Sequence, residues 1–357
     1  MMLYRTLEDI QQYIRLDECE RDWFISREKK NLSLDCRVPD YYLKLIADPA
    51  DREDPIRRQC IPTTQEFHTS SWELTDPLGE ERYTATPRLI HRYPGRALFL
   101  AADTCMMYCR FCFRRRFTSR GSDHVTTSEI DAAAAYLAEH QEIRELLISG
   151  GDPLTLGTEE LNEMIARFRF RSPSVVVRIC TRFPAVYPMG VTDQLVHMLA
   201  AWKPLYIITQ FNHPREVTRD ASAALERCID SGLPVLNQSV LLRGINDTPD
   251  ILEQLMHILI GQRVIPYYLF QGDLAVGTAH FRVSLRQGLQ IVKELGRRIS
   301  GLAMPRYAVD LPGGGGKVLL EETALVREEN GLRTYMNSEG DQFTYPMDEH
   351  ERQLDTS

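Results

Sequence analysis

Apolar and polar positions follow two alternating periods along this chain. From residue 97 onward, short apolar runs alternate with longer stretches in which apolar residues recur at helical spacing. The short runs predict six strands, at residues 97–101, 146–149, 175–179, 205–210, 234–240 and 264–270. The stretches between them predict helices at residues 128–140, 158–168, 192–201, 219–231 and 249–262. Thr126 and Glu129 have the spacing of a capping box, which supports a helix start there.

This alternation indicates a parallel sheet that is covered by helices on both faces. Six strand–helix units predict an α/β fold, a partial (β/α)6 barrel that stays open, and functional groups in such sheets gather at the carboxyl ends of the strands. The cysteines and glycines considered below follow the first and second predicted strands, where this rule places a site.

The two ends of the chain have other patterns. Residues 1–90 form a predicted helical segment that packs on the barrel, with helices at 7–16 and 40–47 and loops at Pro55-Ile-Arg-Arg and Pro62-Thr-Thr. Apolar alternation at 323–326, 332–336 and 342–345 predicts a β-rich extension. We therefore divide the chain into an N-terminal segment (1–90), a barrel core (91–300) and a C-terminal part (301–357).

Composition narrows the class of protein. The 357 residues are 43% hydrophobic and 26% charged, which suits one large globular α/β domain. A net charge of −8 argues against a nucleic-acid binder, which normally has a basic face. The chain contains no run of eighteen apolar residues, so we expect no membrane span. Its N-terminus is polar, so we expect no signal peptide. We expect a cytoplasmic protein without nucleic-acid or membrane partners.

Three of the eight cysteines lie close together, at Cys105, Cys109 and Cys112. Three thiolates at this spacing hold three corners of a [4Fe–4S] cube and leave one iron open. S-adenosylmethionine (SAM) chelates such an iron in radical SAM enzymes, and Phe111 before the third cysteine fits their pattern. A structural zinc site usually has four ligands in paired CxxC motifs, and no second pair lies nearby. A disulfide between two of these cysteines is the other alternative, and the tightness of the loop disfavours it.

Ser149-Gly150-Gly151-Asp152 follows the second predicted strand. Glycines at a strand end allow the backbone to approach a ligand closely, and in radical SAM enzymes such a turn binds the amino group of SAM. The alternative is an ordinary turn between a strand and a helix.

Two later stretches add charged side chains. Asp273 follows the last predicted strand, where it would contact a cationic group or cap a turn. Asp310 precedes a run of four glycines that ends at Lys317. Because four glycines cost conformational entropy on folding, we interpret the run as a hinge that carries a lysine able to bind an aldehyde cofactor. A solvated loop tip and a phosphate loop are the alternatives, although Val318 stands where a phosphate loop has Ser or Thr.

Taken together, these motifs resemble the lysine 2,3-aminomutase family of radical SAM enzymes that use pyridoxal 5′-phosphate (PLP). The resemblance runs from about Pro55 to Lys317. It rests on the cysteine triplet and the lysine loop, and on the following further motifs: His91-Arg92-Tyr93-Pro94-Gly95-Arg96, Arg114-Arg115-Arg116, Ser149-Gly150-Gly151-Asp152, Phe211-Asn212-His213-Pro214, Asn237-Gln238-Ser239 and Asp273-Leu274.

The resemblance implies a role for each matching residue. Lys317 resembles the lysine that binds PLP covalently, and Arg114 resembles the residue that binds the substrate α-carboxylate. The remaining implied roles are: Cys105, Cys109 and Cys112, cluster ligands; Ser149, Gly150, Gly151, Asp152, His213 and Gln238, SAM binding; Arg92, Tyr93 and Arg96, PLP binding; Asp273 and Asp310, binding of the distal ammonium of the substrate.

The paired aspartates favour a cationic substrate, because two buried carboxylates are unfavourable without a cation. The resemblance therefore implies an isomerase that moves the amino group of L-lysine from C2 to C3, through hydrogen abstraction by a radical made from SAM. Arginine as substrate and the relative that supplies β-lysine for modifying elongation factor P are alternatives. Glutamate is disfavoured, because the glutamate-using branch of the family has a basic or amide residue at these positions, and leucine is disfavoured, because it would leave both aspartates unpaired. A non-catalytic Fe–S protein would have no use for Arg92 and Lys317.

Two positions depart from the family pattern. Phe270 stands where members often have Tyr, and Thr248 stands where longer members have a zinc-ligating cysteine. We therefore expect no structural zinc. The resemblance also implies a homo-oligomer and an electron donor such as flavodoxin or ferredoxin.

Overall fold

The computed structural model describes residues 2–27, 34–118, 125–320, 325–329, 332–336 and 341–346. One ten-stranded sheet dominates it, with the strand order β12-β11-β10-β9-β8-β7-β6-β5-β4-β3. The strands are β3 (Thr84–Thr86), β4 (Leu89–Tyr93), β5 (Arg96–Ala102), β6 (Glu145–Gly150), β7 (Val176–Cys180), β8 (Leu205–Thr209), β9 (Val235–Leu241), β10 (Ile265–Gln271), β11 (Arg306–Leu311) and β12 (Gly316–Leu319).

The strands from β5 to β11 pair in parallel, and this part of the sheet is the predicted open barrel. At its two ends the sheet continues with antiparallel neighbours, β4 and β3 on one side and β12 on the other. Because β3 and β12 do not pair with each other, the barrel stays open. Strands β5 to β10 confirm the six predicted positions within a few residues. The sequence missed β11, which begins at an exposed Arg306 and carries the half-buried Asp310.

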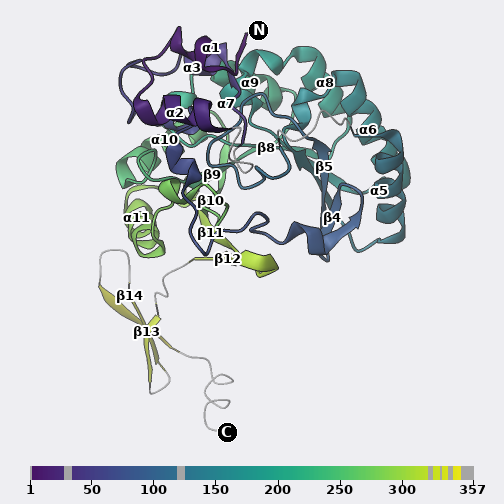
Figure 1. Ribbon diagram of the computed structural model, residues 1–357. Helices are drawn as coiled ribbons and strands as arrows, with labels where there is room; N and C mark the ends of the chain where they lie inside the picture. Colours follow the sequence, from purple (N-terminus) through teal and green to yellow (C-terminus); the bar gives the residue numbers. More distant parts are fainter. Residues whose placement is uncertain are drawn as a thin grey trace.

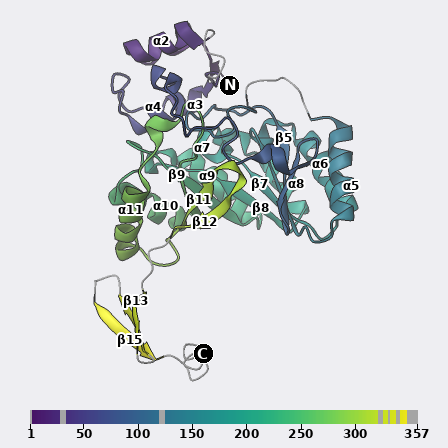
Figure 2. The same cartoon turned by 60° about the horizontal axis from the view of Figure 1, so that its bottom comes forward.

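Helices cover the outer face of the sheet (Figures 1 and 2). They are α5 (Thr127–Glu139), α6 (Thr158–Arg171), α7 (Phe183–Val186), α8 (Asp193–Ala201), α9 (Arg219–Asp230), α10 (Pro249–Gly261) and α11 (Leu285–Arg298). Hydroxyl side chains cap many of them. Thr126 and Glu129 form the predicted capping box of α5, and Thr248 caps α10 by accepting a hydrogen bond from Ile251 N at 3.4 Å.

The inner face of the sheet surrounds a cavity, so the expectation of helices on both faces was wrong. Strand β9 alternates strictly between buried and half-buried residues. Its half-buried Gln238 and Val240 line the cavity, whereas Asn237 and Ser239 are buried. One side of the sheet therefore packs as core and the other side is available to ligands.

The N-terminal part contains α1 (Leu7–Gln11), α2 (Glu18–Ser26), α3 (Asp40–Leu43), α4 (Pro55–Cys60) and the short pair β1 (Leu3–Tyr4) and β2 (Val38–Pro39). The two predicted helices exist but are shorter than expected. The predicted loop at Pro55 was wrong, because proline suits the first position of a helix and Asp54 caps α4 by accepting from Ile56 N at 2.8 Å. This part contacts the barrel through Tyr42, which donates to Glu216 at 2.7 Å.

The C-terminal part contributes to two sheets. Strands β11 and β12 belong to the main sheet, as does β3 of the first segment, and β4 crosses the boundary at residue 90, so the sheet extends across both boundaries that the sequence suggested. The strands β13 (Leu325–Glu329), β14 (Leu332–Met336) and β15 (Gln342–Pro346) form a separate antiparallel sheet, which lies apart from the barrel in Figures 1 and 2. Positions 323 and 324 of the predicted strand at 323–326 lie outside the described residues.

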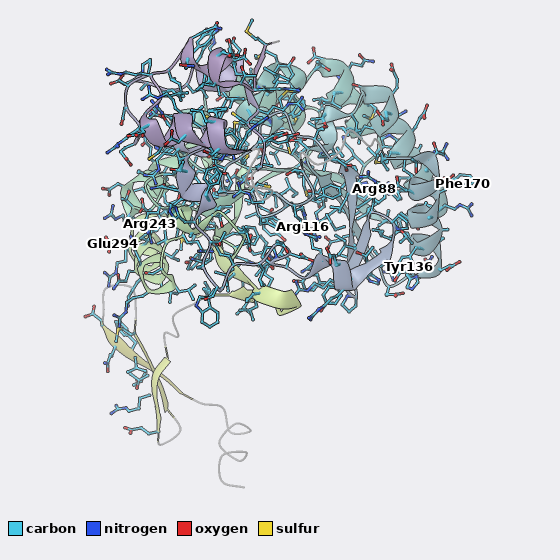
Figure 3. All side chains as sticks on the ribbon, in the orientation of Figure 1. Arg88, Arg116, Tyr136, Phe170, Arg243 and Glu294 are labelled. Atoms are coloured by element: carbon cyan, nitrogen blue, oxygen red, sulfur yellow. The ribbon has the colours of Figure 1, made fainter. Side chains whose placement is uncertain are left out.

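Charged side chains such as Glu294 on α11 lie on the outer surface, and so does Phe170 at the end of α6, which is 83% exposed (Figure 3). Within the described part of the chain, every helix is too short or too polar to cross a bilayer.

Candidate active site

The barrel encloses a cavity of about 390 Å³. It brings together nearly all of the site residues that the sequence predicted: Arg92, Tyr93, Arg96, Cys105, Cys109, Cys112, Arg114, Ser149, Gly150, Gly151, Asp152, Gln238, Asp273, Asp310 and Lys317. His213 is not among the described residues that line it. The His213 ring instead caps a short turn, where its Nδ1 accepts a hydrogen bond from Arg215 N at 3.2 Å.

The cysteine loop leaves β5 at its carboxyl end, as the sequence predicted. Buried Arg110, within the loop, holds it from below by donating to both carboxylate oxygens of Glu66, at 2.7 and 2.6 Å, and to Leu34 O at 2.9 Å. Burial raises the pKa of the Cys105 thiol well above its ordinary value and that of Cys112 to about 11. These two thiols are therefore protonated, and metal binding would release their protons.

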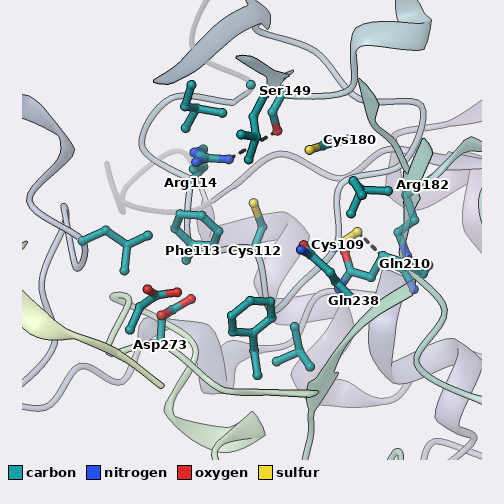
Figure 4. Close-up of a pocket in the computed structure, with 18 of the residues that line it drawn as sticks. Cys109, Cys112, Phe113, Arg114, Ser149, Cys180, Arg182, Gln210, Gln238 and Asp273 are labelled. Atoms are coloured by element: carbon teal, nitrogen blue, oxygen red, sulfur yellow. Dashed lines mark hydrogen bonds between the residues drawn. The ribbon is translucent and has the colours of Figure 1, made fainter. Parts of the chain in front are cut away.

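The donor set fits an Fe–S cube. All three thiols line one cavity from one loop, and the Arg182 guanidinium donates a hydrogen bond to Cys109 Sγ at 2.7 Å (Figure 4). Among the described residues, no three His, Cys, Asp or Glu side chains converge on a single metal-ion position. A cube does not require such convergence, because each cysteine binds a different iron. Thr209 is among the lining residues, and its Oγ1 is buried without a hydrogen-bond partner in the described part of the chain.

The glycine turn packs directly on the start of the cysteine loop. A Cβ atom on Gly151 would lie 2.2 Å from Thr104 O, and Gly150 has a φ of 113°, which favours glycine. Gly151 N donates to Ala102 O at 2.5 Å, and Asp152 N donates to Thr104 O at 2.8 Å. The two segments therefore form one unit at the carboxyl ends of β5 and β6.

Asp152 anchors this unit. Its buried carboxylate accepts from Thr181 Oγ1 at 2.8 Å, from Arg182 N at 2.7 Å and from Leu154 N at 3.0 Å. Burial raises the pKa of Asp152 to about 6, against these three donors, which favour the ionised form.

Lys317 lies on β12 opposite Asp310 on β11, because the antiparallel register pairs these two residues. Its Nζ donates to Asp310 Oδ2 at 3.0 Å and lies 3.8 Å from the centre of the Phe270 ring. Burial lowers the pKa of Lys317, although Asp310 and Asp273 oppose the shift. A strand, and not a helix, follows the glycines, so the phosphate-loop alternative was wrong.

Arginines lie beside this lysine. Tyr93 Oη accepts a hydrogen bond from Lys317 N at 3.0 Å, and the Arg96 guanidinium lies 3.9 Å from the centre of the Tyr93 ring. A Cβ atom on Gly316 would lie 3.2 Å from Arg92 Nη2. The β4–β5 hairpin thus presents two guanidinium groups next to the lysine amine, which fits a cofactor that carries both an aldehyde and a phosphate.

The glycine loop is held by the segment that precedes β3. Gly313 N donates to Pro77 O at 3.0 Å, Tyr83 Oη donates to Gly314 O at 3.3 Å, and a Cβ atom on Gly79 would lie 3.0 Å from Gly314 N. The loop therefore packs against this segment, and Gly313, Gly314 and Gly316 also have φ values of 63°, 86° and 98°, which favour glycine.

Asp273 and Arg114 are the two remaining charged residues that the sequence predicted for the site. Burial, and next the charge of Asp310, raises the pKa of Asp273 to about 7. Arg114 donates to Glu80 Oε1 from Nη2 at 2.6 Å and from Nε at 3.0 Å, a partner that the sequence did not reveal. In the view of Figure 4, Arg114 and Asp273 lie on either side of Phe113, and Cys112 and Cys109 lie to the right of Phe113.

Comparison with protein-family models matches residues 100–255 to the Radical SAM superfamily. This range contains the cysteine loop and the glycine turn. Together with the partial barrel, these features define a radical SAM protein, and the match supports a [4Fe–4S] cluster and SAM as its cofactors.

Curated relatives define the class further. The chain is 40% identical over 345 residues to L-lysine 2,3-aminomutase of Fusobacterium nucleatum, covering 97% of this chain and 80% of that protein. It is 39% identical over 340 residues to L-lysine 2,3-aminomutase of Clostridium subterminale, covering 95% and 81%. It is also 39% identical over 289 residues to glutamate 2,3-aminomutase of Clostridioides difficile, covering 81% and 68%. The chain belongs to the lysine 2,3-aminomutase family.

Proposed function

We propose that the chain is an isomerase that binds PLP as well as the cluster and SAM, and that it moves the amino group of L-lysine from C2 to C3. The percentage identity by itself does not choose the substrate, because relatives named for lysine and for glutamate are both 39% identical to this chain, over 340 and 289 residues respectively. The charges in the cavity make that choice.

The observation that carries the proposal is the pair Asp273 and Asp310 with Lys317. Asp310 accepts a hydrogen bond from Lys317 Nζ at 3.0 Å, and the pKa of Asp273 is raised to about 7 because burial and the charge of Asp310 disfavour its ionised form. A second cation would therefore stabilise the ionised form of the pair, and the ε-ammonium of the substrate lysine supplies this cation. The side chain of glutamate would add a third carboxylate beside Asp273 and Asp310, and neighbouring like charges repel.

The other end of the substrate is an α-carboxylate, which Arg114 suits. Its Nε and Nη2 are held by Glu80, while Nη1 lies 3.5 Å from Ser149 Oγ on the cavity side. We propose that Nη1 donates to the substrate carboxylate and that Glu80 fixes the plane of the guanidinium. Arg114 and the aspartate pair would then select an amino acid with a cation at its far end.

PLP supplies an aldehyde for the substrate amine and delocalises an unpaired electron when bound. Lys317 would hold it covalently, because burial lowers the pKa of its amine and thereby increases the neutral, nucleophilic form. Arg92 and Arg96 would hold its phosphate. Ser149, Gly150 and Gly151 would hold SAM beside Cys105, Cys109 and Cys112, with Gln238 on the neighbouring wall.

We also infer from the resemblance that the chain works in the cytoplasm as a homo-oligomer and receives its electron from a flavodoxin or ferredoxin. Its eight cysteines, all unpaired among the described residues, are consistent with a reducing compartment.

A spectral titration tests the choice of substrate. The PLP-loaded chain is titrated with lysine, with glutamate and with norleucine, which has the lysine carbon chain but no ε-ammonium. Lysine is expected to change the cofactor absorption at a concentration at least about a hundredfold below norleucine, because norleucine leaves the carboxylates unpaired. The difference should vanish in Asp273→Asn. Equal binding of norleucine and lysine to the unaltered chain would refute the role of the aspartates.

A further inference from the structure

Arg182 reaches from the end of β7 to the cysteine loop. Its Nη1 donates to Cys109 Sγ at 2.7 Å, and the side chain is 8% exposed (Figure 4). This contact was not predictable from the sequence, because the two residues are separated by more than seventy positions.

The guanidinium is fixed by partners on every other side. Nη2 donates to Glu216 Oε1 and to Gln59 Oε1, both at 2.6 Å. Nε donates to Gln210 O at 3.4 Å, and the backbone N of Arg182 donates to Asp152 Oδ2 at 2.7 Å. The buried charge therefore has one orientation, and that orientation aims Nη1 at the sulfur.

Glu216 is itself held in place. It is fully buried, accepts from Tyr42 Oη at 2.7 Å, and accepts from the backbone N of Asn212 at 2.6 Å and of His213 at 2.8 Å. This network spans α3, α4 and the turn after β8. The pairing of Arg182 with Glu216 does not require the hydrogen bond to Cys109. We therefore interpret that hydrogen bond as a separate role of Arg182.

We propose that Arg182 raises the reduction potential of the cluster by donating a hydrogen bond and a positive charge to the Cys109 thiolate. The inference rests on the proposed binding of a [4Fe–4S] cluster by the three cysteines. The reduced cluster carries one more negative charge than the oxidised cluster, so a neighbouring cation and an N–H donor stabilise the reduced form more. The guanidinium stays protonated throughout, so no proton accompanies the electron.

The dry surroundings strengthen this effect. Arg182, Glu216 and Gln59 are all buried, and charges interact more strongly where water does not screen them. Arg182 is thus a positioning residue that acts on the cluster through a ligand, and its readout is a potential, which a purely structural role would not change.

The test is an anaerobic redox titration of the reconstituted chain without SAM, followed by electron paramagnetic resonance. It compares the unaltered chain with Arg182→Gln and with the double variant Arg182→Gln/Glu216→Gln, which leaves no unpaired buried charge. Both variants should bind the same amount of iron and show a more negative midpoint potential. At the midpoint of the unaltered chain, their ratio of reduced to oxidised cluster should fall about tenfold, which is about 59 mV for one electron.

A matched control removes another buried pair. Arg57 is 1% exposed and donates to Glu20 at 2.9 and 2.6 Å, but it does not line the cavity. The variant Arg57→Gln/Glu20→Gln should lose thermal stability and keep the midpoint potential. Arg182→Lys, which keeps the charge, should have a midpoint between those of Arg182→Gln and the unaltered chain.

Two results would overturn the inference alone. One is a double variant that binds a full cluster with an unchanged midpoint. The other is a shift in Arg182→Gln that disappears in the double variant, because the uncompensated charge of Glu216 would then be its cause. An unaltered chain that takes up no cluster would instead overturn the proposed function, and the inference with it.

Discussion

Replacing Asp273 by asparagine should increase the free energy of unfolding of the cofactor-free chain and raise KM for lysine in the enzyme. The pKa of Asp273 is raised from 3.8 to about 7, first by burial and then by Asp310, with Lys317 and Arg114 in opposition. One pKa unit corresponds to 1.36 kcal/mol, so ionising this carboxyl in the folded chain costs on the order of 4 kcal/mol more than in water. Asparagine has nearly the same shape and never ionises.

The pH dependence follows from the sign of this shift. A carboxyl whose pKa is higher in the folded chain favours folding fully below about 3.8, and this contribution is lost as the pH rises through about 7. Asp273→Asn should therefore be more stable than the unaltered chain by about 2 kcal/mol at pH 5.5, where the carboxyl is ionised only in the unfolded chain, and by about 4 kcal/mol at pH 8.5. Thermal unfolding at the two pH values measures the difference.

The same substitution should weaken substrate binding. A hydrogen bond to a charged group contributes about 1.5–3 kcal/mol, so KM for lysine should rise about 10- to 100-fold. In the unaltered enzyme, lysine affinity should increase as the pH rises through about 7, because Asp273 then ionises.

Asp131→Asn provides the control, because Asp131 is an exposed residue of α5 that pairs with Arg167 at 2.8 Å. It should change neither the pH dependence nor KM. The reasoning would be refuted if Asp273→Asn destabilised the chain equally at both pH values, or if lysine affinity were constant between pH 6 and 8.5.

Three further substitutions test other parts of the site. Lys317→Ala should abolish the visible absorption of bound PLP, and retention of that band would exclude Lys317 as the covalent partner. Gly151→Ala should destabilise the chain by about 1–3 kcal/mol and weaken SAM binding, because its Cβ would lie 2.2 Å from Thr104 O; Gly261→Ala, which meets nothing within 4 Å, is the control in thermal unfolding and SAM-binding assays. Arg114→Lys should raise KM for the substrate lysine about tenfold or more, because the substituted side chain lacks the planar fork of a guanidinium. An unchanged KM would argue against the contact between Arg114 and the substrate carboxylate.

The sequence predicted the barrel because its strands are continuous apolar runs with capped helices between them. It missed β11, where Arg306 and Asp310 interrupt the apolar pattern: Arg306 is exposed at the start of the strand, and Asp310 lines the cavity. It also missed α4, because the proline that suggested a loop occupies the first helical position.

The site residues were predictable where chemistry is encoded in a short motif, as in the cysteine loop and at Lys317. Glu80 and Arg182 were not, because each acts through a partner far away in the chain: Arg114 for Glu80, and Cys109 for Arg182. His213 shows the reverse case, since it belongs to a recognisable motif but its ring caps a turn.

The central claim is that the aspartate pair selects lysine for a radical 2,3-amino shift. Its most direct test is anaerobic turnover with reconstituted cluster, SAM, PLP and reductant, in which lysine, arginine, ornithine and glutamate are offered in parallel and each β-amino isomer is detected by chiral mass spectrometry. We expect β-lysine from the unaltered chain and none from Asp273→Ala. Isomerisation of glutamate with lysine left unchanged would contradict it.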